Sequence, residues 1–188
     1  YAYVVKGNDF EFSLGKASGT MQSYKYKGET LIETGPQADF WRGYTENDKN
    51  SGKYKLFDTN WQKASGNIKV SDISVSENSL SQNVITVTKT YPDVGNTVVK
   101  TVYTINGNGE VTISFTVDAT KAKMGNFLRV GSAMVLPEGF EDITWYGNGP
   151  YETYNDRKSC ARQGVWNSTV SDMFYPYMKV DDSGNLTD

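Results

Sequence analysis

The chain has 188 residues and a formal net charge of −3, so we expect one domain with a sizeable core and no binding to nucleic acid, which needs a basic surface. No apolar run reaches the roughly 20 residues that span a bilayer, which argues against a membrane protein. The sequence has no histidine and a single cysteine, Cys160, so we predict no metal site, no cofactor and no serine–histidine or cysteine–histidine catalytic pair.

The N-terminal part predicts a meander of short antiparallel strands. In Phe10–Leu14 apolar residues fall at every second position, which is the period of a half-buried strand. A turn at residues 15–19 leads into a second strand, Met21–Tyr26, and a third follows at Thr30–Glu33. The short spacing between these segments is typical of hairpins.

The segment Gly35–Gly52 has a different character. Gly35-Pro36 is expected to break the meander, and a run that joins Phe40, Trp41 and Arg42 to an Asn47-Asp48 pair follows. Aromatic faces stack on sugar rings and amide or carboxylate groups bind hydroxyls, so a loop that faces a sugar is one interpretation. The alternative is that Phe40 and Trp41 anchor the loop in the core.

From residue 68 onward the chain alternates apolar and polar residues and predicts a β-protein with one face of each strand buried. Lys55–Lys63 is expected to be a short helix or an irregular connection. Asn106-Gly107 is the strongest signal for a two-residue hairpin turn. The strands that we predict are Ile68–Val75, Val84–Tyr91, Thr97–Ile105, Val111–Val117, Asn126–Leu136 and Ile143–Tyr146.

The stretch Thr144–Arg157 carries a dense polar cluster behind a glycine- and proline-rich turn. Glu152, Asp156 and Arg157 lie among tyrosines, and an arginine between two carboxylates can either hold a loop in place or bind a polyhydroxylated ligand. We predict a structural cluster of these three residues, and both roles stay open.

Three motifs, in this order along the chain, resemble the C-terminal, small-chain-type domain of family-two β-galactosidases. The most specific is Gly147-Asn-Gly-Pro-Tyr-Glu-Thr-Tyr-Asn-Asp-Arg157. The loop Phe40–Asp48 resembles the family's Phe-x-Arg-Ala-Pro-Thr-Asp-Asn-Asp motif through Arg42, Asn47 and Asp48, with Gly43-Tyr44 in place of Ala-Pro. Ser171-Asp172, followed by Tyr175-Pro-Tyr177, resembles a third family element.

The resemblance implies an all-β fold, an antiparallel β-supersandwich like that of galactose mutarotases, that is incomplete at the C-terminus. Residues 1–188 would form a single domain, the N-terminal two thirds of the family's small-chain domain. The implied partners are a catalytic barrel domain and a β-galactoside or another carbohydrate, with homo-oligomers formed through open sheet edges. Residues 48–53 would form a flexible loop beside the barrel's active site. The implied substrate-binding residues are Trp41, Arg42, Asn47 and Asp48.

Three functions follow from these expectations. The first is a non-catalytic accessory domain, because family-two hydrolysis uses two carboxyl groups of the barrel. The second, a mutarotase-type epimerase, requires a histidine that the chain lacks. The third is a free-standing carbohydrate-binding module with Trp41, Trp145, Tyr151 or Trp166 as stacking platforms. The compartment is left open, with a lean to a bacterial periplasmic or secreted location.

Overall fold

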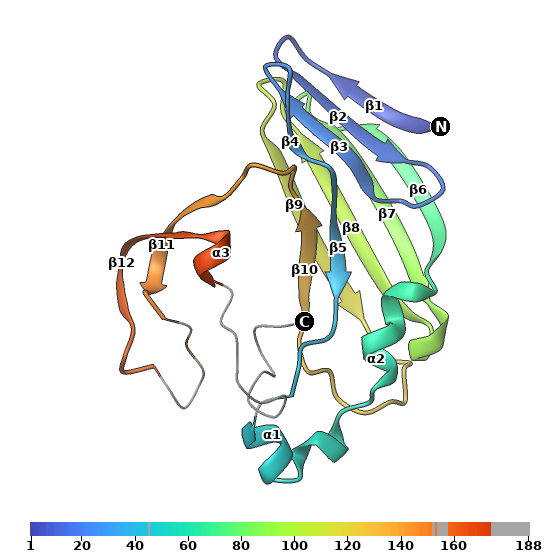
Figure 1. Cartoon of the computed structure of the whole chain (residues 1–188). Helices are drawn as coiled ribbons and strands as arrows, with labels where there is room; N and C mark the ends of the chain where they lie inside the picture. Colours follow the sequence, from blue (N-terminus) through green and yellow to red (C-terminus); the bar gives the residue numbers. More distant parts are fainter. Residues whose placement is uncertain (45, 152, 154–157, 174–188) are drawn as a thin grey trace.

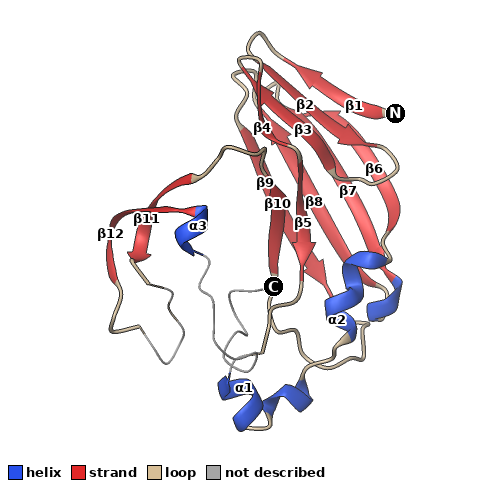
Figure 2. Cartoon of the chain, in the orientation of Figure 1, coloured by secondary structure: helices blue, strands red, loops and turns tan. Residues whose placement is uncertain are grey.

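The computed structural model describes residues 1–44, 46–151, 153 and 158–173. These residues form an all-β sandwich of antiparallel sheets, as the alternating sequence pattern predicts (Figure 1). Most of the short helical segments gather at one end of the sandwich, where they connect strands, whereas the helix at Val170–Met173 follows the last described strand (Figure 2).

The first four-stranded sheet is the predicted N-terminal meander. Its order is β1-β2-β3-β4, and the strands are β1 (Ala2–Lys6), β2 (Phe10–Gly15), β3 (Met21–Tyr26) and β4 (Glu29–Ile32). Phe10, Phe12 and Leu14 are buried because every second side chain of β2 points to the inner face. Strand β1 was not predicted from the sequence.

The second four-stranded sheet packs beneath the first and contains the longest strands. Its order is β6-β7-β8-β9, with β6 (Lys69–Glu77), β7 (Asn83–Tyr91), β8 (Thr97–Ile105) and β9 (Val111–Asp118). All four agree with the predicted strands to within two residues. The inner face of β8 is buried along its whole length, whereas the apolar side chains of the edge strand β9 stay half-buried.

The turn between β8 and β9 differs from the two-residue turn that Asn106-Gly107 predicts. The Asn106 amide N–H bonds the Glu110 carbonyl at 2.9 Å, so three residues form the loop. Gly109, not Gly107, takes the left-handed conformation, with φ +90°. A three-residue loop with a left-handed glycine is the next most common hairpin connection.

Two further strand pairs stand outside the four-stranded sheets. Strand β5 (Thr34–Asp39) pairs with β10 (Gly131–Val135), and β11 (Asp142–Gly149) pairs with β12 (Arg162–Thr169). The expectation that Gly35-Pro36 breaks the meander is confirmed, because the first sheet ends at β4 and β5 pairs with β10 instead. The pair itself lies inside β5, as a bulge in which both residues oppose Met134. Strand β12 had not been predicted.

The glycine at position 35 is required by the close approach of β10. Its φ is +99°, and a Cβ there would lie 2.8 Å from the Ala133 carbonyl oxygen and the Met134 Cα. A larger residue would therefore separate the two strands.

The helical segments are α1 (Glu46–Asn50), η1 (Lys53–Leu56), α2 (Asn60–Lys63), η2 (Ala64–Gly66), η3 (Pro92–Val94) and α3 (Val170–Met173). Segments η1 and α2 confirm the expectation of short helical structure near residues 55–63. Helix α1 occupies the beginning of the predicted flexible loop, residues 48–53. No described helix is long and apolar enough to cross a membrane.

The interior divides into two apolar clusters with a polar layer between them. The first cluster joins β2 and β3 to β7 and β8, and the second lies around Phe40, Trp61 and Tyr91 near the helical end. On the inner face of β7, Lys89 lies between Val87 of the first cluster and Tyr91 of the second. Lys89 is only 5% exposed and donates a 2.6 Å hydrogen bond from Nζ to Thr20 Oγ1.

Candidate functional site

The loop that follows β5 begins with an aromatic anchor in the second cluster. Phe40 is 2% exposed, and its ring lies 5.3 Å from Trp61 and 5.6 Å from both Tyr91 and Phe127. Trp61 fixes the other side of this group, because its indole N–H donates to the Gly125 carbonyl at 3.0 Å. Phe40 therefore takes the core position that the sequence offered as the alternative to a sugar-facing role.

Trp41 is half-buried and packs against the same cluster. Its backbone N–H bonds Asp39 Oδ1 at 3.1 Å, and its ring meets Tyr44 edge-on at 5.3 Å. Tyr44 in turn lies 6.4 Å from Phe57. Burial, and next to it the charge of Asp48, raises the pKa of the Tyr44 phenol, so this phenol stays neutral and can donate a hydrogen bond.

Arg42 and Asp48 form an ion pair that closes the loop onto α1. Arg42 Nη1 lies 2.8 Å from Asp48 Oδ2 and also donates to the Gly43 carbonyl at 2.7 Å. The Arg42 side chain is 24% exposed and that of Asp48 is 13% exposed. Each side chain thus compensates the charge of the other at a site where both are largely removed from solvent.

Asn47 lies beside this pair but faces solvent. Its backbone carbonyl accepts the Ser51 N–H at 3.2 Å and the Ser51 hydroxyl at 2.5 Å, which closes the last turn of α1. The structure therefore brings Trp41, Arg42, Asn47 and Asp48 together on one short segment. Their assignment to substrate binding stays a prediction.

A second arginine–carboxylate pair, which the sequence analysis missed, lies next to this loop. Arg129 Nη2 pairs with Asp39 Oδ2 across 90 positions of sequence. No local pattern in the sequence connects Asp39 to Arg129. In the part of the chain that the structure describes, both Asp39 and Asp48 are therefore neutralised by arginine.

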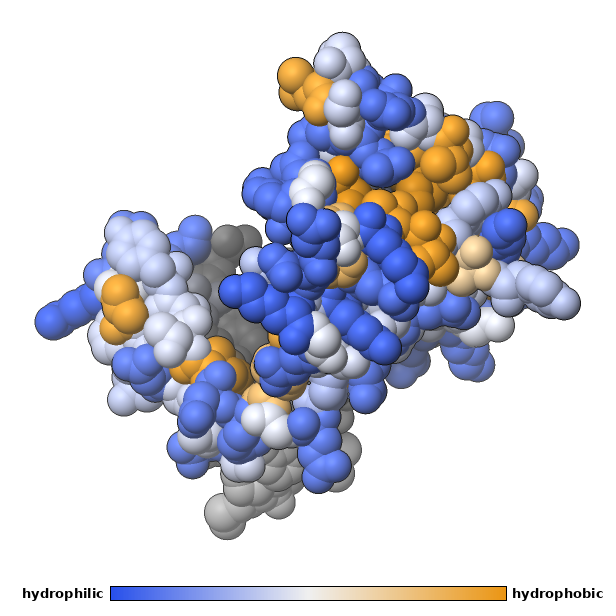
Figure 3. All heavy atoms as spheres, turned by 90° about the horizontal axis from the view of Figure 1, so that it is seen from above, coloured by the Kyte–Doolittle hydropathy of each residue, from blue (hydrophilic) through white to orange (hydrophobic). Residues whose placement is uncertain are grey.

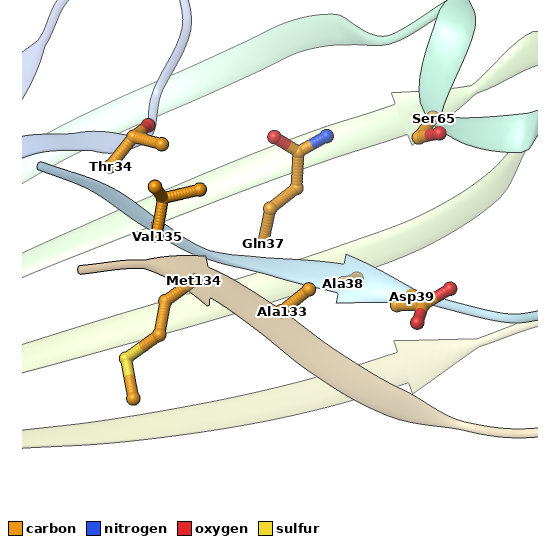
Figure 4. A pocket seen from close by; sticks show the side chains of 9 residues that line it. Thr34, Gln37, Ala38, Asp39, Ser65, Ala133, Met134 and Val135 are labelled. Atoms are coloured by element: carbon orange, nitrogen blue, oxygen red, sulfur yellow. The ribbon is translucent and has the colours of Figure 1, made fainter. Parts of the chain in front are cut away.

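A cavity of about 250 Å³ opens beside Asp39, between β5, β10 and Ser65 of η2 (Figure 4). Gln37, Val135 and Thr34 project from the two strands toward it, whereas Met134 points to the opposite side. Ala133 contributes only a methyl group to the lining. Sequence reasoning gave no signal for this cavity, since β5 itself was not predicted.

The hairpin β11–β12 presents two tryptophans side by side. Trp145 pairs with Trp166 across the strands, and their indole N–H groups donate to the carbonyls of Asn148 and Gly147, each at 3.1 Å. A Cβ on Gly149 would lie 2.6 Å from Trp166 Cδ1, so the indole lies directly on the glycine backbone. Both rings are half-buried.

The polar cluster predicted at Glu152, Asp156 and Arg157 lies outside the described residues, and its role stays a prediction. Tyr151, just before it, is 68% exposed. Among the residues that the structure does describe, no group of three histidine, cysteine, aspartate or glutamate side chains could hold a metal ion.

Comparison with known proteins matches residues 6–188 to the family model described as β-galactosidase small chain. A β-galactosidase of Streptococcus thermophilus is 31% identical over 183 residues, which cover 96% of this chain and 17% of that protein. A β-galactosidase of Halalkalibacterium halodurans is also 31% identical, over 186 residues that cover 97% of this chain and 18% of the relative. The β-galactosidase of Priestia megaterium is 29% identical over 198 residues, with 98% of this chain and 17% of the relative covered.

This chain thus spans less than a fifth of the length of these relatives. The match nevertheless extends over almost the whole of it and agrees with the three motifs seen in the sequence and with the all-β fold. The chain belongs to the β-galactosidase small chain family.

Proposed function

We propose that the chain is a non-catalytic accessory domain of a family-two β-galactosidase, in which a separate barrel domain hydrolyses terminal β-galactosides. The observation that carries this proposal is the matched share: nearly all of this chain corresponds to about 17% of the relatives named β-galactosidase. The domain would shape the rim of the active site through the loop Trp41–Asp48 and contribute to assembly.

The chemistry of the described carboxylates supports a non-catalytic role. A retaining glycosidase needs two carboxyl groups about 5 to 5.5 Å apart, one of which attacks the sugar and one of which transfers a proton. Asp39 and Asp48 are each already engaged in an ion pair with an arginine. A mutarotase reaction through a histidine acid is disfavoured because the chain has no histidine.

We also propose that residues 1–188 belong to one sandwich domain that further strands complete. Among the residues that the structure describes, strands β10, β11 and β12 each pair with one neighbour only, and the outer edge of such a strand can accept a further strand. In Figure 3 the hairpin β11–β12 forms a separate lobe beside the sandwich. Large apolar side chains are exposed on and around these strands: Val130, Met134, Val135, Leu136, Phe140, Tyr146, Val165, Val170 and Met173.

These exposed side chains predict either coverage by other parts of a longer polypeptide or self-association of the chain through its open edges. Light scattering of the isolated chain detects self-association, and amide hydrogen exchange detects strand edges that stay open in a monomer. A strictly monomeric chain with protected amides along β10 and β11 would show that the sandwich is complete as it stands.

The accessory role is tested by exchanging the corresponding domain of a related β-galactosidase for this chain. In the Streptococcus thermophilus β-galactosidase, the 183 residues that match this chain would be deleted in one variant and replaced by this chain in another. The deletion should lose β-galactosidase activity and the replacement should regain at least part of it. A replacement variant that is soluble and correctly assembled, yet as inactive as the deletion, would contradict the proposal.

Carbohydrate binding by the chain itself is the second candidate function. The observation that favours it is the pair of half-buried indoles of Trp145 and Trp166, together with the exposed ring of Tyr151. Titration with galactose and lactose, followed by tryptophan fluorescence, tests it. A module that binds sugar should show a saturable change that a Trp145→Ala variant loses, whereas an accessory domain without a sugar site shows none.

A further inference from the structure

The cavity between β5 and β10 has the chemistry of a small ligand site, and the substrate-binding residues predicted from the sequence do not line it. Its volume is about 250 Å³, somewhat below the usual range for drug-sized ligands, which begins at roughly 300 Å³. The space therefore suits a single small ring and not an extended oligosaccharide.

Part of the cavity lining consists of uncharged polar groups. Gln37 is half-buried, and its side-chain amide makes no hydrogen bond to any residue that the structure describes. Figure 4 shows this amide projecting into the open space above the β5–β10 ribbon. An amide offers two donors and an acceptor, and the hydroxyls of Thr34 and Ser65 line the same space.

The cavity carries no uncompensated charge. Asp39 is the only ionisable group among the lining residues, and Arg129 pairs with its Oδ2 while the Trp41 N–H bonds its Oδ1. A charged ligand would have to displace Arg129 or remain unpaired. A neutral ligand with several hydroxyl groups meets donors and acceptors without either cost.

The apolar part of the lining comes from Ala133 and Val135 of β10, which pair across the strands with Gln37 and Thr34 and share their face of the two-stranded sheet. A pyranose ring has one face of C–H groups and a rim of hydroxyls, and it therefore fits a site in which apolar and hydrogen-bonding groups lie next to each other. We propose that this cavity binds one neutral sugar ring, free or at the end of a glycan, with Gln37 as the principal hydrogen-bonding residue. This inference rests on the proposed membership of a carbohydrate-processing enzyme, but it concerns a site of this chain alone.

The test is saturation-transfer-difference NMR of the full chain with galactose and with methyl β-galactoside, since this method observes the sugar and also works if the chain self-associates. Gln37→Leu removes the amide at similar volume, and Ala133→Leu fills the space. Gln163→Leu, on the exposed face of β12, is the matched control. Circular dichroism and thermal melting establish that each variant is folded.

The expected result is weak saturable binding that Gln37→Leu lowers by about fivefold, as for the loss of one or two hydrogen bonds, and that Ala133→Leu abolishes. The control should bind like the original chain. No transfer to either sugar, or equal transfer in all variants, would overturn the inference. If Ala133→Leu instead raises the melting temperature and no sugar binds, the cavity is a packing gap.

The sugar site and the accessory role can be refuted independently of each other. The replacement in the Streptococcus thermophilus enzyme can regain activity although Gln37→Leu changes nothing, and then only the sugar site is refuted. Binding that depends on Gln37, in a chain whose replacement variant stays inactive, would refute the accessory role and leave the site standing.

Discussion

Lys89 offers the sharpest test of how this sandwich is packed. The side chain lies on the inner face of β7, is 5% exposed, and has one hydrogen bond, to Thr20. Burial lowers the pKa of Lys89 from 10.5 to about 8. A difference of this size corresponds to about 3 kcal/mol of destabilisation of the charged form. We therefore expect Lys89→Met, which keeps the length of the side chain, to stabilise the protein at pH 7.

The pH dependence follows from the direction of that pKa change. Between about pH 8 and pH 10.5 the unfolded chain binds more protons at Lys89 than the folded chain does, so the stability of the original protein rises with pH across this window. Below pH 8 the full cost of the buried charge is present. The advantage of Lys89→Met should therefore be about 1 to 3 kcal/mol at pH 7 and should shrink toward zero near pH 10.5.

The assay is urea unfolding of both proteins at several pH values. Burial raises the pKa of Tyr91 and that of Tyr103 to about 12. Both proteins contain these two tyrosines, so their titration cancels in the difference between the two free energies of unfolding. Lys100→Met, on the outer face of β8, is the control and should change stability little. A Lys89→Met protein that is less stable at pH 7, or that differs from the original by the same amount at every pH, would refute the assignment of Lys89 as a desolvated cation.

Four further substitutions examine the loop and the core. Arg42→Ala should lower the free energy of unfolding by about 2 kcal/mol, because it removes the arginine that pairs with the nearly buried Asp48 carboxylate. Adding Asp48→Asn to the same chain should recover part of this loss. If the effects of the two substitutions on chemical unfolding are additive, the ion pair contributes no coupling energy. Tyr91→Phe should be neutral or slightly stabilising, since its buried hydroxyl has no hydrogen-bond partner among the described residues, whereas Tyr24→Phe should cost about 1 kcal/mol by loss of a bond to a backbone carbonyl. Equal melting temperatures for the two phenylalanine variants would contradict this difference.

The strands that could be predicted are those in which local pattern and tertiary environment agree. Val84–Tyr91 and Thr97–Ile105 are rich in β-branched and aromatic residues and are joined by a short turn, so both their existence and their pairing follow from the sequence. Lys89 is the exception within the first of them. It takes a buried inward position because the alternation of its strand places it there, although its own chemistry favours solvent.

The strands that could not be predicted depend on partners far away in the sequence. Residues 34–39 contain Gly35-Pro36, which reads locally as a turn, and they become a strand because β10 pairs with them about 95 positions later. Arg129 reaches Asp39 for the same reason. Long-range pairing of this kind leaves no local trace, and the cavity that it encloses could not be foreseen either.

The candidate loop was predicted in part. Its motif brought Arg42, Asn47 and Asp48 to attention because they lie close together in sequence, and the structure keeps them on one segment. What the motif did not reveal is that Arg42 and Asp48 pair with each other, since which partner an arginine finds depends on the fold of the loop around α1.

Hydrolysis of a chromogenic β-galactoside by the purified chain tests the non-catalytic role of the domain. We expect no turnover above that of buffer, because the two carboxyl groups that family-two hydrolysis requires would lie on a barrel domain outside this chain. Turnover that survives repurification, and that disappears in a Glu46→Gln or Glu152→Gln variant, would instead identify the chain as a glycosidase in its own right.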